Sequence, residues 1–188
     1  MNNEMKIIIL SFISVIFLHS CIIEGLTNDY GKLYPSQKAK VFQLNSFDEA
    51  IPGNVYKLNA DQLKKELLKY PKAIVYIFTS GCTSSHCKPL ITYENYANKY
   101  GYKLFLVMNS YMEFDKAVDQ DISNPIFVID NKYYKSVIRN NYTNYFENEL
   151  LNKPLKTKTE YIGSIYFFQN GELNKIVRDL PQDLTKIN

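Results

Sequence analysis

The apolar residues of the chain fall into short runs that are separated by more polar segments. Ala73–Thr79 and Lys103–Met108 are almost uninterrupted runs of β-branched, aromatic and aliphatic residues, which is typical of strands buried on both faces. Asn54–Leu58 alternates polar and apolar residues, as a half-buried strand does. Gln62–Tyr70 instead has apolar residues at helical spacing and ends before Pro71. Strands alternating with helices predict an α/β sheet.

The C-terminal part predicts a β-hairpin. Ser164–Phe168 and Leu173–Val177 flank the segment Gln169-Asn-Gly171, and Asn-Gly is a favoured pair in a two-residue turn between antiparallel strands. The sheet is therefore expected to be mixed, central and flanked by helices. The remaining expected elements are a short strand at 41–44, helices at 85–99, 112–119 and 142–151, a strand at 126–129 and an amphipathic tail at 180–187.

The N-terminus has a different pattern. An apolar run of 12 residues, Ile7–Leu18, follows Lys6 and precedes small or polar residues. Such a run is too short for a comfortable membrane span and is typical of a secretory signal. Leu18-His-Ser-Cys21 resembles the lipobox of bacterial lipoproteins. This resemblance implies a signal peptide at 1–20 and lipid attachment to Cys21; the alternative is an ordinary signal peptide that leaves Cys21 free.

A lipid on Cys21 implies a cell-envelope lipoprotein on the outer membrane or the periplasmic face, touching the membrane through its N-terminal lipid. Residues 21–50 are polar and irregular, so we expect a tether there and a folded domain at 51–188. The net charge is only +3 and the lysines are scattered singly. No basic stripe is formed, so nucleic acid is not an expected partner.

The candidate chemistry lies between a strand and a helix. With Cys21 lipidated, the three cysteines leave one pair, Cys82 and Cys87, which in an oxidising compartment is expected to be a disulfide at least part of the time. A thiol at a helix entrance is activated, because the helix N-terminus favours the thiolate. His86 either tunes these thiols or is an exposed residue at the start of the helix.

The spacing of the pair restricts where each cysteine lies. On continuous helix, residues five apart are separated by about 7.5 Å of rise, which exceeds the usual Cα separation of a disulfide. A bridge therefore requires Cys82 to lie in the loop before the helix. A bridge closing so small a loop removes little denatured-state entropy, which favours redox chemistry over the alternatives of an inert bridge or idle thiols.

The order of these elements, the stretch Phe78-Thr-Ser-Gly-Cys82 and the hairpin Phe167–Leu173 resemble the thioredoxin fold, in particular the larger thioredoxin-like lipoproteins of Bacteroidetes-type bacteria. The resemblance implies a membrane-anchored thiol–disulfide oxidoreductase with a role in cell redox homeostasis. Cys82 would be the attacking thiolate and Cys87 the resolving thiol. The implied partners are protein thiols and disulfides of the cell envelope, and no cofactor is implied.

The chain departs from that family at two points. The family motif is Cys-x-x-Cys, whereas four residues separate Cys82 from Cys87. The family also places a cis-proline across from its cysteines. Pro125 has a plausible spacing for that role, but alignment on the hairpin places Gly163-Ser164 there instead, and then an insertion falls within about 110–158.

Two other functions remain open. The stretch from Phe78 to Pro89 is also similar to thioredoxin-fold copper chaperones that assemble cytochrome oxidase, and Cys82, Cys87 and His86 would then hold Cu(I). Those chaperones use a distant downstream histidine, and none follows His86 here. The third possibility is a non-catalytic thioredoxin-fold binding module.

Overall fold

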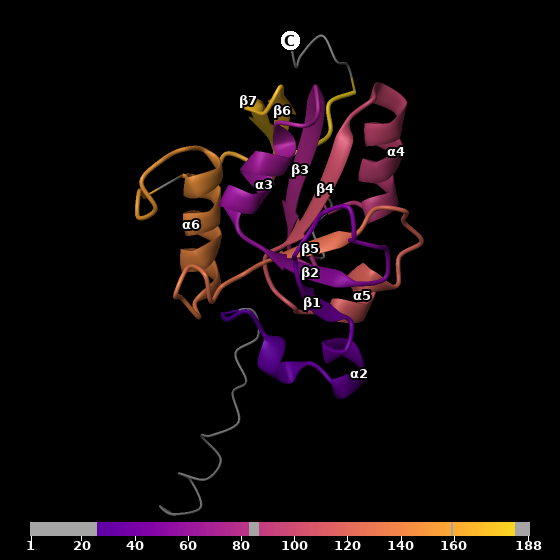
Figure 1. Ribbon diagram of the computed structural model, residues 1–188, viewed down its shortest axis with the longest axis vertical. Coiled ribbons are helices and arrows are strands. Elements are labelled where there is room, and N and C mark those ends of the chain that lie inside the picture. The colour runs from indigo at the N-terminus through magenta and orange to yellow at the C-terminus, as the bar shows by residue number, and fades with distance from the viewer. Residues whose placement is uncertain (1–25, 83–86, 159, 183–188) are drawn as a thin grey trace, which may run out of the picture.

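One mixed sheet forms the centre of the protein in the computed structural model, which describes residues 26–82, 87–158 and 160–182 (Figure 1). In this part of the chain the sheet has seven strands in the order β1-β2-β5-β4-β3-β6-β7. The first five in that order run parallel, β6 is antiparallel to β3, and β7 is antiparallel to β6. The predicted α/β class and mixed sheet are thereby confirmed. The strands are β1 (Val41–Gln43), β2 (Val55–Leu58), β3 (Lys72–Phe78), β4 (Lys103–Met108), β5 (Ile126–Ile129), β6 (Ile165–Gln169) and β7 (Glu172–Val177).

Helices cover both faces of the sheet (Figure 1). α3 and α6 pack together on one face, and α4 and α5 cover the other. Because both faces are covered, β3 is buried from Ala73 to Phe78, which explains its unbroken apolar run. The helices of the described residues are η1 (Tyr30–Lys32), α2 (Pro35–Lys38), α3 (Ala60–Leu67), α4 (Leu90–Tyr100), α5 (Phe114–Val118) and α6 (Arg139–Leu150).

Local sequence determines several ends of these elements. Asn59 caps α3, because its side chain accepts a hydrogen bond from the amide of Gln62 at 2.9 Å. Gly101 ends α4 in the left-handed conformation, which glycine commonly adopts at the end of a helix. Asn170 and Gly171 join β6 to β7 with φ values of 51° and 81°. Both are positive, as a two-residue hairpin turn of the favoured type requires, so the predicted hairpin is confirmed.

The segment expected to contain an insertion contributes to the centre of the sheet. It holds α5, β5 and α6, and β5 lies between β2 and β4. Val55 of β2 is level with Ile126 of β5, which is in turn level with Leu106 of β4. The strand expected at 126–129 is therefore present, and it separates β2 from β4.

Residues 26–50 differ from the expected tether. They contain η1, α2 and β1, and β1 extends the sheet by pairing with β2. Leu33 and Leu44 are buried, one in each of the two cores, because β1 brings the preceding chain onto the sheet. The expected signal peptide at 1–20 and the expected lipid site Cys21 lie outside the described residues. Within the described part of the chain, no helix is both long and apolar enough to cross a membrane.

Candidate functional site

The two cysteines lie just beyond the carboxyl end of β3. Gly81 lies between the end of β3 and Cys82. Its φ is +73°, a conformation that glycine adopts at little cost. Space also requires a glycine here, since an added Cβ would lie 2.5 Å from Cγ of Glu113. The hydroxyl of Ser80 donates to the backbone carbonyl of Glu113 at 2.7 Å. These contacts join the end of β3 to the segment before α5 and direct the chain toward Cys82.

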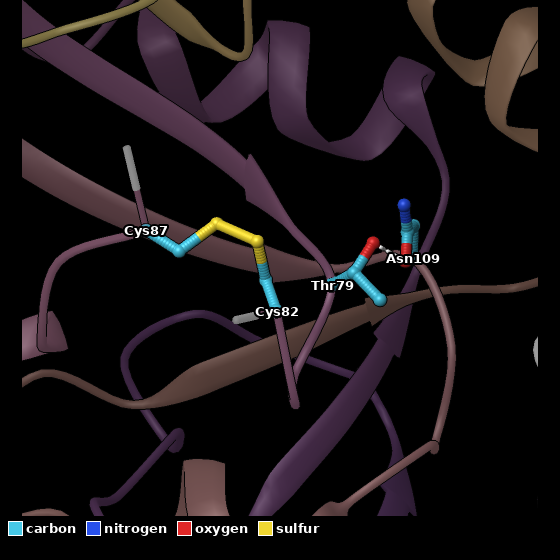
Figure 2. Close-up of a disulfide and its surroundings, with 4 residues drawn as sticks. All are labelled: Thr79, Cys82, Cys87 and Asn109. Carbon is cyan, nitrogen blue, oxygen red and sulfur yellow. Dashed lines mark hydrogen bonds between the residues drawn. A yellow bond between two sulfur atoms is a disulfide. The ribbon is translucent and has the colours of Figure 1, made fainter. Parts of the chain in front are cut away.

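Cys82 and Cys87 form a disulfide, with their Cα atoms 6.0 Å apart (Figure 2). This separation falls within the usual range for a disulfide. Both residues precede α4, as the spacing argument requires. Cys82 is exposed to solvent and Cys87 is half-buried, so the bridge is accessible to a partner. His86 falls in 83–86, outside the described residues.

The start of the helix after the disulfide differs from the expectation. α4 begins at Leu90, with Pro89 as N-cap, whereas the sequence predicted a helix over 85–99. Proline disfavours helical geometry in the residue before it, so the helix cannot extend back through Lys88. Cys82 thus precedes the first helical residue by eight positions (90 − 82). The dipole effect falls off within the first turn, so the helix-entrance argument for activation of Cys82 does not hold.

A polar pair holds the ends of β3 and β4 together beside the disulfide (Figure 2). The hydroxyl of Thr79 donates to the side-chain oxygen of Asn109 at 2.9 Å, and the amide of Asn109 donates to the carbonyl of Phe78 at 2.9 Å. The hydroxyl of Tyr142 in α6 donates to the backbone carbonyl of Asn109. These bonds connect β3, β4 and α6 on the side of β3 that α6 covers.

The helix that follows the disulfide is held by the segment after α5. Gln120 accepts a hydrogen bond from the amide of Leu90 at 2.7 Å and so caps α4 from a distance. Glu94 is buried, and its carboxylate accepts hydrogen bonds from the amides and side chains of Ser123 and Asn124. Buried charge is tolerated when donors surround it in this way.

The disulfide separates two cavities. The larger, about 390 Å³, lies between the disulfide and α6. The smaller, about 240 Å³, lies between the disulfide and the segments around α4 and α5. Cys82, Cys87, Tyr76 and Thr79 line both cavities. We call them the α6 cavity and the α4 cavity.

The α6 cavity contains a carboxyl group with altered acidity. Burial raises the pKa of Glu147, and a hydrogen bond with the Tyr166 side chain opposes this in part. A carboxyl of this kind holds its proton to higher pH than an exposed glutamate. Burial also raises the pKa of the phenol of Tyr76, whose ring stacks on that of Tyr93 with centroids 3.9 Å apart. Glu147 is therefore the group of this cavity best suited to hold or move a proton.

The structure does not bring Pro125 to the cysteines. Ile126 is level with Leu106 of β4, which is level with Tyr76 of β3. Pro125 therefore lies at the amino end of β5, two strands from β3, whereas the cysteines follow the carboxyl end of β3. The described residues contain no cis peptide bond, so the Pro125 peptide is trans.

The segment before β6 lies beside the carboxyl end of β3. The carbonyl of Ser164 accepts a hydrogen bond from the amide of Ile77 at 2.9 Å, and Ser164 lines the α6 cavity together with both cysteines. Gly163 passes so close to the backbone of Val177 that an added Cβ would overlap it. Ser164 thus lies in the wall of the cavity that the disulfide also lines.

Sequence reasoning missed the wall of the α6 cavity. Asn140, Asn144 and Glu147 recur at i, i+4 and i+7 of α6 and line the cavity, whereas Tyr142, Phe146 and Leu150 are buried in the core. This polar stripe beside an apolar one is a detectable signal. The pattern does not show that this stripe faces the disulfide, because α6 follows Cys82 by more than 50 residues.

Metal ligands do not gather in the described residues, which hold no group of three or more histidine, cysteine, aspartate and glutamate side chains placed to bind an ion. Comparison of the chain with protein-family models, with curated proteins and with solved structures returned no match.

Proposed function

We propose that the protein is a thiol–disulfide oxidoreductase with a thioredoxin-like fold, and that the Cys82–Cys87 bridge is its redox centre. The observation that carries this proposal is the placement of the bridge: it is accessible to solvent and has a cavity on each side. Its loop is too small to stabilise the fold much by chain entropy. A bridge with so small a stabilising role and so open a position is suited to exchange.

In the oxidising direction, a substrate thiolate attacks the sulfur of Cys82, the more exposed partner. The Cys82–Cys87 bond breaks, and Cys87 leaves as a thiolate that takes up a proton. A second substrate thiolate then attacks the substrate sulfur of the mixed disulfide, which releases Cys82 as a thiolate that is protonated. Two substrate thiols have then lost two electrons and two protons, and the protein disulfide has gained them. Reduction of a substrate disulfide is the reverse sequence.

Proton movement in this scheme is assigned to Glu147. Its carboxyl shares the α6 cavity with both cysteines, and burial raises its pKa, so near neutrality it is more readily protonated than an ordinary glutamate. It would give a proton to the leaving thiolate and take one back when the dithiol is oxidised again. A group with a pKa closer to the working pH does this better than an exposed glutamate.

The proposed setting is the cell envelope, with protein thiols and disulfides as partners and with attachment to the membrane through a lipid on Cys21. The N-terminal apolar run and the lipobox-like segment support this part of the proposal. The fold part is supported by the sequence β3-α4-β4, in which the cysteines follow β3, and by the β6-β7 hairpin beside β3.

Turnover assays with single-cysteine variants test the function. We expect Cys82→Ser and Cys87→Ser each to abolish insulin reduction and the rescue of scrambled ribonuclease. In Cys87→Ser a mixed disulfide on Cys82 should accumulate, because no resolving thiol remains. Cys21→Ser is the matched control, which loses a sulfur outside the pair and should keep both activities. Full activity in both variants of the pair would refute the proposal.

A further inference from the structure

We propose that the substrate is a cysteine-containing peptide segment with a basic side chain beside its cysteine, and that this side chain enters the α6 cavity. This inference rests on the proposed exchange activity and specifies what is exchanged. It follows from the charges and hydrogen-bonding groups that surround the disulfide.

The described walls of the two cavities carry opposite charges. The α6 cavity is lined by Glu147 and Glu160 and, among described residues, by no lysine, arginine or histidine. The α4 cavity is lined by Lys88 and Lys116 and by no carboxylate in the part of the chain that is described. Lys116 is 3.1 Å from the carboxylate of Glu113, so that side is partly neutralised. A peptide laid across the bridge thus meets negative charge toward α6.

The α6 cavity also offers neutral groups to a ligand. Asn140, Asn144 and Asn109 line it with amide groups that accept and donate hydrogen bonds. The hydroxyl oxygen of Thr143 is buried and has no hydrogen-bond partner among the described residues. A buried hydroxyl without a partner is costly, so this wall of the cavity contains an unsatisfied polar group.

An aromatic ring completes the rim of the α6 cavity. Tyr161 is 64% exposed, and its ring already has the guanidinium of Arg178 5.5 Å from its centroid. Arg178 also donates to the carbonyl of Ile162 at 3.3 Å and does not line the cavity. At about 390 Å³ the cavity is within the size range of ligand pockets and can take a long side chain. Lysine and arginine match such a lining of carboxylates, amides and an aromatic ring.

Charge-matched peptides test the inference. Three peptides carry one cysteine and differ only in the two residues that flank it: lysine, glutamine or glutamate. Each is mixed with the oxidised protein, and the rate at which the Cys82–Cys87 bridge opens is measured by stopped flow at constant thiolate concentration. We expect the lysine peptide to react about fivefold faster than the glutamine peptide, and the glutamate peptide to be slowest. At about 1 M salt the differences should shrink, because the charges are screened.

Two variants locate the effect. Glu160→Gln removes an exposed carboxylate and should reduce the ratio of lysine to glutamine rates. Glu147→Gln should reduce it less, because burial raises the pKa of this carboxyl and so lowers its average negative charge. Glu49→Gln is the matched control, because Glu49 is exposed in the segment between β1 and β2, at the opposite edge of the sheet, and should leave the ratio unchanged.

The outcomes separate this inference from the proposed function. Equal rates for lysine and glutamine peptides, or a lysine preference that survives both cavity variants, would overturn the inference while exchange itself still stands. Failure of all three peptides to open the bridge would overturn the proposed function.

Discussion

The two sides of β3 at its carboxyl end are built from the same strand but differ in how their polar groups are satisfied. On the α4 side, Glu94 and Gln120 are bound to backbone and side-chain donors that fix the helix after the disulfide. On the α6 side, Glu147 has a pKa raised by burial, and Thr143 has a buried hydroxyl without a partner among described residues.

This difference assigns a structural role to the polar groups on the α4 side and a role in exchange to those on the α6 side. Groups that are saturated with hydrogen bonds make a rigid frame, whereas groups left partly unsatisfied are available to a ligand or a proton. The disulfide lies between the two sides and has a cavity on each. Substitutions on the α4 side should therefore lower the free energy of unfolding. Substitutions on the α6 side should change the titration of Glu147 and the rate of thiol–disulfide exchange.

The largest loss of stability is expected from Glu94→Ala. The substitution empties the buried site of the Glu94 carboxylate and removes the acceptor of four donors of Ser123 and Asn124. The expected cost is about 3 kcal/mol in the free energy of unfolding, measured by chemical denaturation. Glu49→Ala, at an exposed position, should change it by less than about 0.5 kcal/mol. Equal effects of the two variants would show that Glu94 does not hold α4.

Gly81→Ala tests the point where the two sides meet. It combines a positive φ with an added Cβ 2.5 Å from Glu113, so we expect a loss of about 2 kcal/mol. Gly53→Ala is the matched control, because Gly53 also has a positive φ, of 80°, but has open space around it. It should lose only about 1 kcal/mol. Glu113→Ala in the Gly81→Ala background should recover part of the stability that Gly81→Ala loses beyond Gly53→Ala. No recovery would contradict the steric explanation.

Removal of the distant cap of α4 has a smaller effect. Gln120→Ala should cost about 1 kcal/mol, because the amide of Leu90 loses its acceptor. Hydrogen exchange at the first turn of α4 should become faster, while exchange at α6 should not change. Gln120→Glu keeps an acceptor and serves as the control. Unchanged exchange at Leu90 in Gln120→Ala would show that another group caps the helix.

The smallest expected effect is the pH dependence that Glu147 contributes. Burial raises the pKa of this carboxyl above 4.5, so the folded chain binds its proton more tightly than the unfolded chain. Stability from this group is therefore present below about pH 4.5 and is lost as the pH rises through the raised pKa. Glu147→Gln should remove this pH dependence. The variant should therefore be more stable than the wild type at neutral pH but not at pH 4. Parallel stability curves would refute the assignment.

The sequence predicted much of the frame because its signals are local. The apolar run of β3 and the Asn170-Gly171 turn each act within a few residues, and the structure confirms both. The requirement that Cys82 lie in a loop followed from helix geometry and is also confirmed. The expected helix start at residue 85 was wrong because Pro89 determines where the helix begins.

Features that depend on distant pairing could not be predicted. The apolar residues of β5 predicted a strand, but its place between β2 and β4 is decided by which neighbours bury it. The sequence predicted the short strand at 41–44, but the packing of residues 26–40 onto the sheet could not be predicted, because apolar residues such as Leu33 are sparse in this polar stretch. The α6 wall of the cavity was missed for the same reason: its polar stripe becomes part of a site only when α6 packs beside β3.

The most direct test of the central claim is the reduction potential of the Cys82–Cys87 pair, measured by equilibration with glutathione in the Cys21→Ser protein. An accessible bridge with an exchange function should have a potential between about −270 and −120 mV, the range of thiol–disulfide oxidoreductases. A potential below about −300 mV would mark a structural disulfide and contradict the account.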